Sequence, residues 1–248
     1  MEIVVNKKES NQILYKIISK TEDEYELSGI NYRIIRRVKK NNVEKAPEML
    51  FLKEKACNDE YLLCIQNDNA RSEVLLGTVL HVDTDKEYLN RCLSLYNNVG
   101  IYAFPLLTTE KQMEFDISNV NFDFHPDVIV LTGHDYFKGD NKKDINDYVN
   151  SKYFATAVLS ARKKYPNSVI IAGACQSLFE VLIAKGANFA SSPKRENIHI
   201  YDPAIMAINV CITSQKKIVN LEKIKKHIEN IDSSFGGVET YGKMKVMY

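Results

Sequence analysis

Two short runs of consecutive apolar residues dominate the hydrophobic pattern of this chain, Val-Ile-Val-Leu at 128–131 and Val-Ile-Ile-Ala at 169–172. Because neither run alternates with polar residues, the pattern predicts strands that are buried on both faces of a parallel sheet. The stretch 150–164 between them predicts a helix with one apolar face, made of Tyr153, Phe154, Ala157, Val158 and Ala161. A right-handed crossover makes the two strands parallel, so their carboxyl ends lie at one edge of the sheet.

Strand and helix patterns continue to alternate from residue 74 onward. Apolar runs bounded by Gly and Pro indicate strands, and apolar positions three and four apart indicate helices. The predicted strands are 74–82, 100–104, 187–191, 197–201 and a short one at 216–219, and the predicted helices are 85–96, 110–120, 176–185, 204–212 and 221–231. Pro105 is expected to end the strand before it, and 233–248 to be irregular. The sequence therefore predicts an α/β fold with a mostly parallel sheet flanked by helices.

The N-terminal residues follow a different pattern. Stretches at 12–19, 24–27 and 32–38 predict short strands with many charged positions, so one face of this sheet is solvated. We predict a small N-terminal β-barrel-like module at 1–40, a connector at 41–73 and an α/β domain at 74–248. A substrate-binding module and a β appendage packed on the main domain are equally compatible with this pattern.

Composition narrows the classes of function. The formal net charge is +1, which provides no global field for nucleic acid or acidic membranes. Five cysteines without a CxxC motif argue against a disulfide framework or a zinc cluster and indicate a reducing compartment. No apolar run approaches the roughly 20 residues that span a bilayer, and the N-terminus lacks the apolar region of a secretion signal. We therefore expect a cytoplasmic protein that binds neither nucleic acid nor membrane.

Each of the two central strands is followed by a reactive side chain, His134 after Thr-Gly and Cys175 after Ala-Gly-Ala. The small residues before Cys175 let a substrate backbone approach, and the helix predicted at 176–185 points its N-terminus at the sulfur, which favours the thiolate. Histidine can take the thiol proton and later protonate a leaving amine. Either residue alone is more often structural, but together they form a candidate nucleophile–base pair.

Three further residues are expected near the same edge of the sheet. Asp135 could orient His134, bind a cationic substrate group or be solvated. His199 is a competing base on a later predicted strand. Asp202 could accept an Arg or Lys side chain, or it could cap the helix at 204–212 with Pro203 as the first helical residue. The sequence leaves these alternatives open.

His81 and Asp83 follow each other closely at the end of another predicted strand. Two potential metal ligands without a third make a weak metal signature, so we interpret Asp83 as the cap of the helix at 85–96. The chain also contains no phosphate-binding loop, dinucleotide-binding glycine motif or HExxH motif. No metal site is predicted.

The order of these motifs resembles the caspase-like cysteine peptidases, which place a histidine after one apolar strand and Ala-Cys after the next. One departure is Gly133-His134-Asp135 in place of the usual His-Gly. The sequence therefore does not determine which backbone N–H forms the oxyanion hole. A more specific resemblance is to the YabG family of sporulation-specific cysteine peptidases. It is carried by Val79–Asp83 with Tyr88 and Leu89, Thr132-Gly-His-Asp135, Asn150-Ser-Lys-Tyr-Phe154, Ala172-Gly-Ala-Cys-Gln-Ser177, Gly186-Ala-Asn-Phe-Ala-Ser-Ser-Pro193, His199 with Asp202-Pro203, and Gly236-Gly-Val-Glu-Thr240.

The resemblance implies a cysteine endopeptidase of endospore-forming bacteria that processes spore coat and cortex-related proteins, cleaving after Arg. Its matched catalytic positions are His134 and Cys175, and the chemistry needs no metal or organic cofactor. A preference for Arg requires a pocket carboxylate, for which we favour Asp202 over Asp135 because Asp135 is tethered to His134. The implied place is the cytoplasm of the sporulating cell, with association to the spore coat as a further option.

Two rival functions belong to other classes. One is an amidotransferase-like cysteine hydrolase, in which Cys175 lies on a nucleophile elbow and His199 is the base. The other is a non-catalytic scaffold for spore-coat proteins. The sequence does not determine the natural substrates, self-processing or the oligomeric state.

Overall fold

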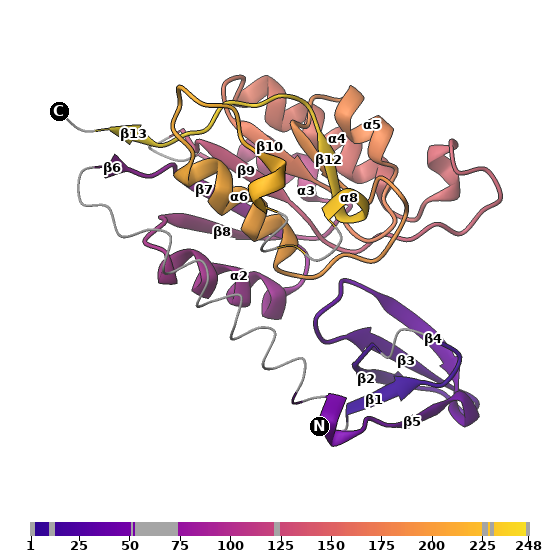
Figure 1. Ribbon diagram of the computed structural model, residues 1–248. Coiled ribbons are helices and arrows are strands. Elements are labelled where there is room, and N and C mark those ends of the chain that lie inside the picture. The colour runs from indigo at the N-terminus through magenta and orange to yellow at the C-terminus, as the bar shows by residue number, and fades with distance from the viewer. Residues whose placement is uncertain are drawn as a thin grey trace.

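The computed structural model describes residues 3–9, 13–50, 52, 74–121, 125–224, 228 and 231–246, and its strands form an antiparallel sheet near the N-terminus and a larger, mostly parallel sheet (Figure 1). A short antiparallel pair, β6 (Val74–Leu75) with β13 (Lys245–Val246), joins two segments from opposite ends of the larger part. Most of the connector expected at 41–73 lies outside the described residues. No helix among the described residues is long and apolar enough to cross a membrane.

The N-terminal sheet has the strand order β4-β3-β2-β1-β5. Its strands are β1 (Ile3–Asn6), β2 (Tyr15–Lys20), β3 (Glu24–Gly29), β4 (Ile35–Lys39) and β5 (Val43–Lys45), with the 3-10 turn η1 (Lys40–Asn42) before β5. The sequence predicts the β2–β3–β4 meander, but β1 and β5 are found only in the structure. Because β5 pairs with β1, the sheet continues to Lys45, past the predicted end of the module at residue 40.

The larger sheet has the order β12-β11-β10-β9-β7-β8, and its pairings are parallel except that of β12 with β11. Its strands are β7 (Val79–Asp83), β8 (Ala103–Leu107), β9 (Val128–Leu131), β10 (Val169–Ala172), β11 (Phe189–Ser191) and β12 (Phe235–Gly237). The chain runs from β7 outward to β8 and then returns past β7 to β9. The strand order therefore reverses between β7 and β9, and such reversals open a crevice at the carboxyl ends of the strands.

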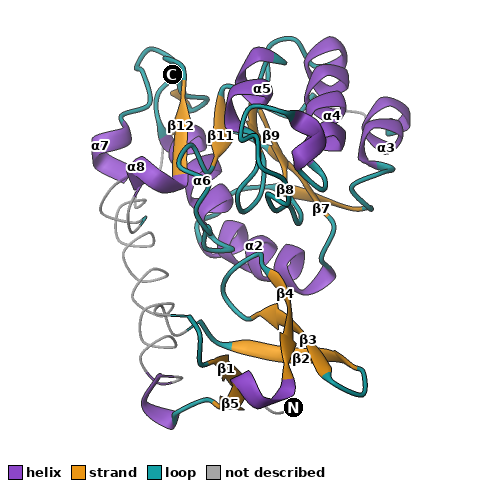
Figure 2. Ribbon diagram, turned by 90° about the vertical axis from the view of Figure 1, so that its right-hand side faces the viewer, coloured by secondary structure: helices purple, strands orange, loops and turns teal. Residues whose placement is uncertain are grey.

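Helices cover both faces of this sheet (Figures 1 and 2). They are α2 (Lys86–Asn98), α3 (Met113–Asn119), α4 (Ser151–Lys164), α5 (Phe179–Ala184), α6 (Asp202–Ile212), α7 (Leu221–Ile224) and α8 (Ile231–Ser234). Residues Val128 and Val130 of β9 pack toward α2 and α6, whereas Ile129 and Leu131 pack toward α3, α4 and α5. The prediction of an α/β fold with a small N-terminal β module is confirmed.

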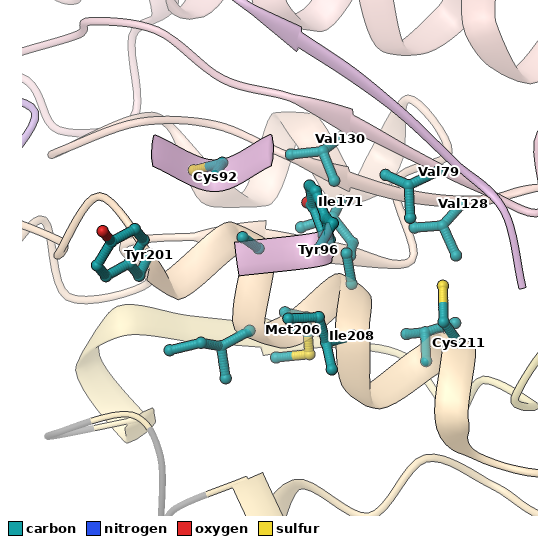
Figure 3. Close-up of a cluster of buried hydrophobic side chains, with 14 of the residues drawn as sticks. Val79, Cys92, Tyr96, Val128, Val130, Ile171, Tyr201, Met206, Ile208 and Cys211 are labelled. Carbon is teal, nitrogen blue, oxygen red and sulfur yellow. The ribbon is translucent and has the colours of Figure 1, made fainter. Parts of the chain in front are cut away.

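The core on the α2–α6 side is shown in Figure 3. Cys92 and Cys211 are fully buried there, in one cluster with Tyr96 and Met206. Burial raises the pKa of the Cys92 thiol to about 12. These two cysteines are therefore core residues with protonated thiols, and their positions within helices distinguish them from Cys175, which follows a strand.

Several local predictions are wrong, and three of the errors have a tertiary cause. Pro105 lies inside β8 instead of ending a strand, because β8 is an edge strand and has no second neighbour that needs the missing N–H. The segment 197–201 does not join the larger sheet; it forms a single antiparallel bridge between His199 and Tyr32 of the N-terminal part. Within 233–248, β12 adds an antiparallel edge to β11. The helix expected at 221–231 begins as α7 and lies partly outside the described residues.

Gly173 ends β10 with a φ of +108°, and a Cβ atom there would lie 3.0 Å from Leu182 Cδ1 and 3.3 Å from Ser191 Cβ. Gly173→Ala should lower the free energy of unfolding through both backbone strain and overlap. The control is Gly100→Ala, where φ is +73° and nothing lies within 4 Å, so only backbone strain of about 1–3 kcal/mol applies. Urea unfolding of both variants should show the larger loss for Gly173→Ala; equal losses would contradict the packing argument.

Candidate active site

Three neighbouring strands bring polar residues to one edge of the larger sheet. Val82 of β7 pairs with Leu131 of β9, which pairs with Ala172 of β10. Asp83 is the last residue of β7, and His134 and Cys175 each come three residues after the paired residues Leu131 and Ala172. All three therefore lie near the same edge of the sheet. Asp83 and His134 flank the point where the strand order reverses, the usual position of a site in an open α/β sheet.

Cys175 lies in a tight turn between β10 and α5. Ala174 N donates a hydrogen bond to Ser177 Oγ at 2.9 Å, and Gln176 has a φ of +59°. The sulfur is buried, accepts a hydrogen bond from Ile198 N at 3.3 Å and lies 3.8 Å from Ile198 O. The loop before His199 therefore closes over the sulfur.

The expected helix N-terminus at Cys175 is not found. The structure begins α5 at Phe179, after the turn, and α5 is only six residues long. Burial raises the pKa of the Cys175 thiol to about 11, although the Ile198 N–H and the charges of Arg33 and Arg36 favour the thiolate. In this conformation the thiol is therefore protonated at neutral pH.

Backbone contacts fix His134 in its position. Its N–H donates to Glu110 Oε1 at 2.9 Å, and its carbonyl oxygen accepts from Asn150 Nδ2 at 2.7 Å. Ring Nδ1 lies 3.5 Å from Thr84 Oγ1 and 3.7 Å from Glu110 Oε1. The other ring nitrogen, Nε2, is buried and has no hydrogen-bond partner among the described residues. The Nδ1 side of the imidazole is thus held by neighbouring residues, while Nε2 makes no hydrogen bond within the described residues.

Glu110 and Thr84 are functional candidates that the sequence analysis misses. Thr84 Oγ1 donates to Glu110 Oε1 at 2.7 Å, so the carboxylate is fixed beside the imidazole. Burial opposes its ionisation, but hydrogen bonds from His134 and Thr84 lower the pKa of Glu110 to about 2. Gly133 permits this approach, since a Cβ there would lie 2.6 Å from Thr84 Oγ1 and 2.9 Å from Glu110 Oε1. Of these three residues, only Gly133 could have been noticed in the sequence, because it directly precedes His134.

Asp135 is turned into the structure next to His134. It accepts hydrogen bonds from Tyr136 N at 2.9 Å and Asn150 N at 2.8 Å, and also from the Ser151 hydroxyl. Ser151 Oγ in turn accepts from Leu178 N at 2.8 Å. Burial raises the pKa of Asp135. These contacts connect the loop after β9 to the start of α4 and to the turn that carries Cys175.

Asp202 is the first residue of α6, whose N-cap is Tyr201. Asp202 Oδ2 accepts a hydrogen bond from His199 N at 2.9 Å, and its side chain is buried. Pro203 occupies the first turn as expected, but the capping role does not fall to Asp202. His199 Nδ1 accepts from Tyr201 N at 3.3 Å, and burial lowers the pKa of His199 to about 3.

Asp83 does not cap α2; that role belongs to Asp85, which accepts from Glu87 N and Tyr88 N. Asp83 instead binds Arg33 of the N-terminal part, with Nη1–Oδ1 and Nη2–Oδ2 distances of 2.8 and 2.7 Å. Burial would raise the pKa of Asp83, but the Arg33 guanidinium holds it well below its usual range. Both side chains are fully buried.

No group of three or more His, Cys, Asp or Glu side chains that could hold a metal ion occurs in the described part of the chain. The pair His81 and Asp83 gains no third such ligand there: His81 Nδ1 instead meets the Tyr96 hydroxyl at 2.9 Å. The geometry at this edge is that of a thiol and an imidazole held by carboxylates and backbone groups.

Comparisons with known proteins identify the family of this chain. The sequence model of the family described as YabG peptidase U57 matches residues 1–248. The chain is 39% identical over 175 residues to the sporulation-specific protease YabG of Bacillus subtilis (strain 168). This match covers 68% of this chain and 60% of that relative. The matched part thus spans well under two thirds of the relative's length. No solved structure matches. On the match over its whole length, this chain belongs to the YabG peptidase U57 family.

Proposed function

We propose that this chain is a cysteine endopeptidase of sporulation that cleaves spore coat and cortex-related proteins after Arg. Cys175 supplies the nucleophile and His134 the acid–base group. The observation that carries the proposal is the placement of these two residues after adjacent parallel strands, with His134 held by Glu110 on one side and Nε2 without a partner among the described residues on the other. Family membership supports a peptidase, and the relative's name supports a role in sporulation.

The proposed reaction uses only groups of this chain and water. His134 takes the proton of the Cys175 thiol as the sulfur attacks the carbonyl carbon of the scissile peptide bond. His134 then gives that proton to the leaving amine, which leaves an acyl group on the sulfur. A water molecule, deprotonated by His134, attacks this thioester, and the thiol leaves with a proton. Glu110 holds a negative charge beside Nδ1 and would stabilise the imidazolium that forms in each step.

The amidotransferase-like alternative needs His199 as the base. Burial lowers the pKa of His199 to about 3, with the charges of Arg91 and Arg33 acting in the same direction. Its ring is therefore neutral at physiological pH, and its Nδ1 already accepts the Tyr201 N–H. A group that protonates so reluctantly is a poor proton carrier near neutrality, which favours His134. The scaffold alternative has no structural observation in its favour.

The carboxylate that would receive the Arg side chain of a substrate is a separate question. The sequence favours Asp202, with Asp135 second, and both assignments stay predictions. The three hydrogen bonds that Asp135 accepts from residues of its own region argue for a structural role. Asp202 is bound to the His199 N–H. We also propose an N-terminal module that ends at Lys45 instead of residue 40, because β5 pairs with β1, followed by a connector up to residue 73 and a domain at 74–248. A place in the cytoplasm or at the coat of the forming spore is a further part of the proposal.

Replacement of the nucleophile should abolish cleavage without unfolding the protein. Cys175→Ala removes one sulfur from a turn that Ala174 N and Ser177 Oγ also hold. The control is Cys211→Ala, which should keep activity but lose on the order of 1 kcal/mol of stability, because a fully buried side chain is truncated. Turnover of a fluorogenic Arg peptide and thermal unfolding measure both effects. Normal turnover by Cys175→Ala would show that Cys175 is not the nucleophile.

Two histidine variants separate the peptidase from the amidotransferase-like hydrolase. His134→Ala should lower kcat by roughly 10²–10⁴-fold, the usual contribution of a general acid–base group. His199→Ala should cost less, since its ring is neutral and bound to the backbone. The measurement is kcat for an Arg peptide ester and for glutamine hydrolysis. The reverse ranking of the two variants would favour the amidotransferase-like function.

Glu110 should act as a positioning residue. Glu110→Gln keeps the size of the side chain but removes the charge beside His134 Nδ1, so kcat should fall at least about tenfold, which corresponds to about 1.4 kcal/mol, while KM stays near its original value. Glu114→Gln, an exposed neighbour in α3, is the matched control. A loss of melting temperature without a change in kcat would show that Glu110 only stabilises the fold.

A further inference from the structure

The N-terminal part contacts the candidate active site through a buried arginine. Arg33 follows β3 in a tight turn, in which Gly29 N donates to Ile34 O at 2.8 Å. Its guanidinium binds both oxygens of Asp83, and its centre lies 5.2 Å from the centroid of the Tyr88 ring. A carboxylate that accepts from both Nη atoms and an aromatic ring on the face of the guanidinium are two elements of a receptor for an arginine side chain.

This receptor lies beside the catalytic candidates. Asp83 is followed directly by Thr84, whose hydroxyl is 3.5 Å from His134 Nδ1. Tyr88, which lines the receptor, has its ring centroid 6.0 Å from that of His134. The Arg33 charge also acts on the Cys175 thiol, favouring its ionisation. An arginine side chain bound to Asp83 therefore lies next to Thr84 and Tyr88, the two residues that contact the His134 ring.

The backbone before Arg33 is held by a single antiparallel bridge and one further backbone hydrogen bond. Tyr32 forms an antiparallel bridge with His199, and Ile200 N donates to Asn31 O at 2.9 Å. The segment it pairs with begins next to Ile198, whose N–H contacts Cys175 Sγ. Extended peptides commonly bind proteins in this way, with backbone hydrogen bonds for affinity and a side-chain pocket for specificity. Residues 31–33 thus combine a paired backbone with an arginine side chain in a pocket.

We propose that Asp83 is the specificity-determining residue that receives the arginine side chain of the substrate, and that Arg33 occupies this pocket in the conformation described. The inference rests on the proposed function for its substrate class. A substrate must then displace residues 31–33, so the N-terminal module acts as an internal competitor. The apparent affinity for substrate is reduced by the fraction of molecules in which the pocket is filled.

A purely structural ion pair is the competing explanation. Removing two charges from water is costly, and a buried pair often adds little net stability compared with apolar residues of the same volume. Moreover, Arg33 Nε is buried without a hydrogen-bond partner among the described residues, so the pocket leaves one donor of its present occupant unsatisfied. A pocket that also accepts other arginine side chains accounts for the burial of a costly ion pair and for its incomplete hydrogen bonding.

The first experiment measures binding without catalysis. Arg33→Ala empties the pocket, and millimolar ethylguanidinium should raise the melting temperature of this variant by about 3 °C at a concentration well above its dissociation constant. Neutral ethylurea should not. The same addition should leave Arg37→Ala unchanged, because the Arg37 side chain is 77% exposed and its ion pair is with Glu26 at the surface. Absence of rescue in Arg33→Ala, or equal rescue in the double variant Arg33→Ala/Asp83→Asn, would overturn the receptor.

The second experiment measures specificity. Asp83→Asn should lower kcat/KM for an Arg peptide at least about tenfold relative to the matching Gln peptide, as expected for the loss of about 1.4 kcal/mol. Arg33→Ala should lower KM for the Arg peptide and keep the Arg/Gln ratio. If Asp202→Asn collapses the ratio while Asp83→Asn leaves it unchanged, the pocket belongs to Asp202 and the inference is wrong.

The two experiments fail in different ways. If neither the parent protein nor any variant cleaves a peptide, the proposed peptidase function is wrong. The effect of ethylguanidinium on the melting temperature of Arg33→Ala still tests whether Asp83 binds a guanidinium group. If the parent protein cleaves after Arg and rescue is absent, the peptidase stands and the role of Asp83 is overturned. Equal stability losses in Asp83→Asn and Arg33→Ala with an unchanged Arg/Gln ratio would show a structural ion pair only.

Discussion

The burial of both faces of the larger sheet is the constraint on which the rest of this structure depends. β9 and β10 are completely apolar, and helices cover them on each side, so a polar side chain can leave the core only where a strand ends. Parallel register then gathers Asp83, His134 and Cys175 at one edge. The reversal of strand order between β7 and β9 opens this edge, and the chemistry follows from that geometry.

Long-range hydrogen bonds turn this collection of side chains into a defined site. Glu110 fixes the backbone of His134 and lies near its ring, while Asp135 connects the loop after β9 to α4 and, through Ser151, to the segment after Cys175. Three of these hydrogen bonds satisfy a backbone N–H, those of His134, Asn150 and Leu178, which would otherwise be unpaired. The same polar groups thus serve both the fold and the orientation of the candidate catalytic pair.

The N-terminal sheet contributes directly to the burial of this edge. Tyr32 pairs with His199, Arg33 enters the pocket at Asp83, and Arg91 of α2 donates to Ile30 O at 2.7 Å. With the module in this position the Cys175 thiol is shielded from water, and burial raises its pKa to about 11. A cysteine that must ionise to react is therefore held in its protonated form, which agrees with a conformation in which the pocket is occupied.

The sequence by itself determined the two central strands, the helix between them and the placement of His134 and Cys175 at their ends, because apolar runs and small-residue turns are local signals. The tertiary structure alone decided that Asp83 binds Arg33, fifty residues away, and that Glu110 supports His134. It also decided that Pro105 fits an edge strand and that 197–201 faces the N-terminal part. These outcomes depend on which segments become neighbours, and a charged side chain shows no local preference among distant partners of opposite charge.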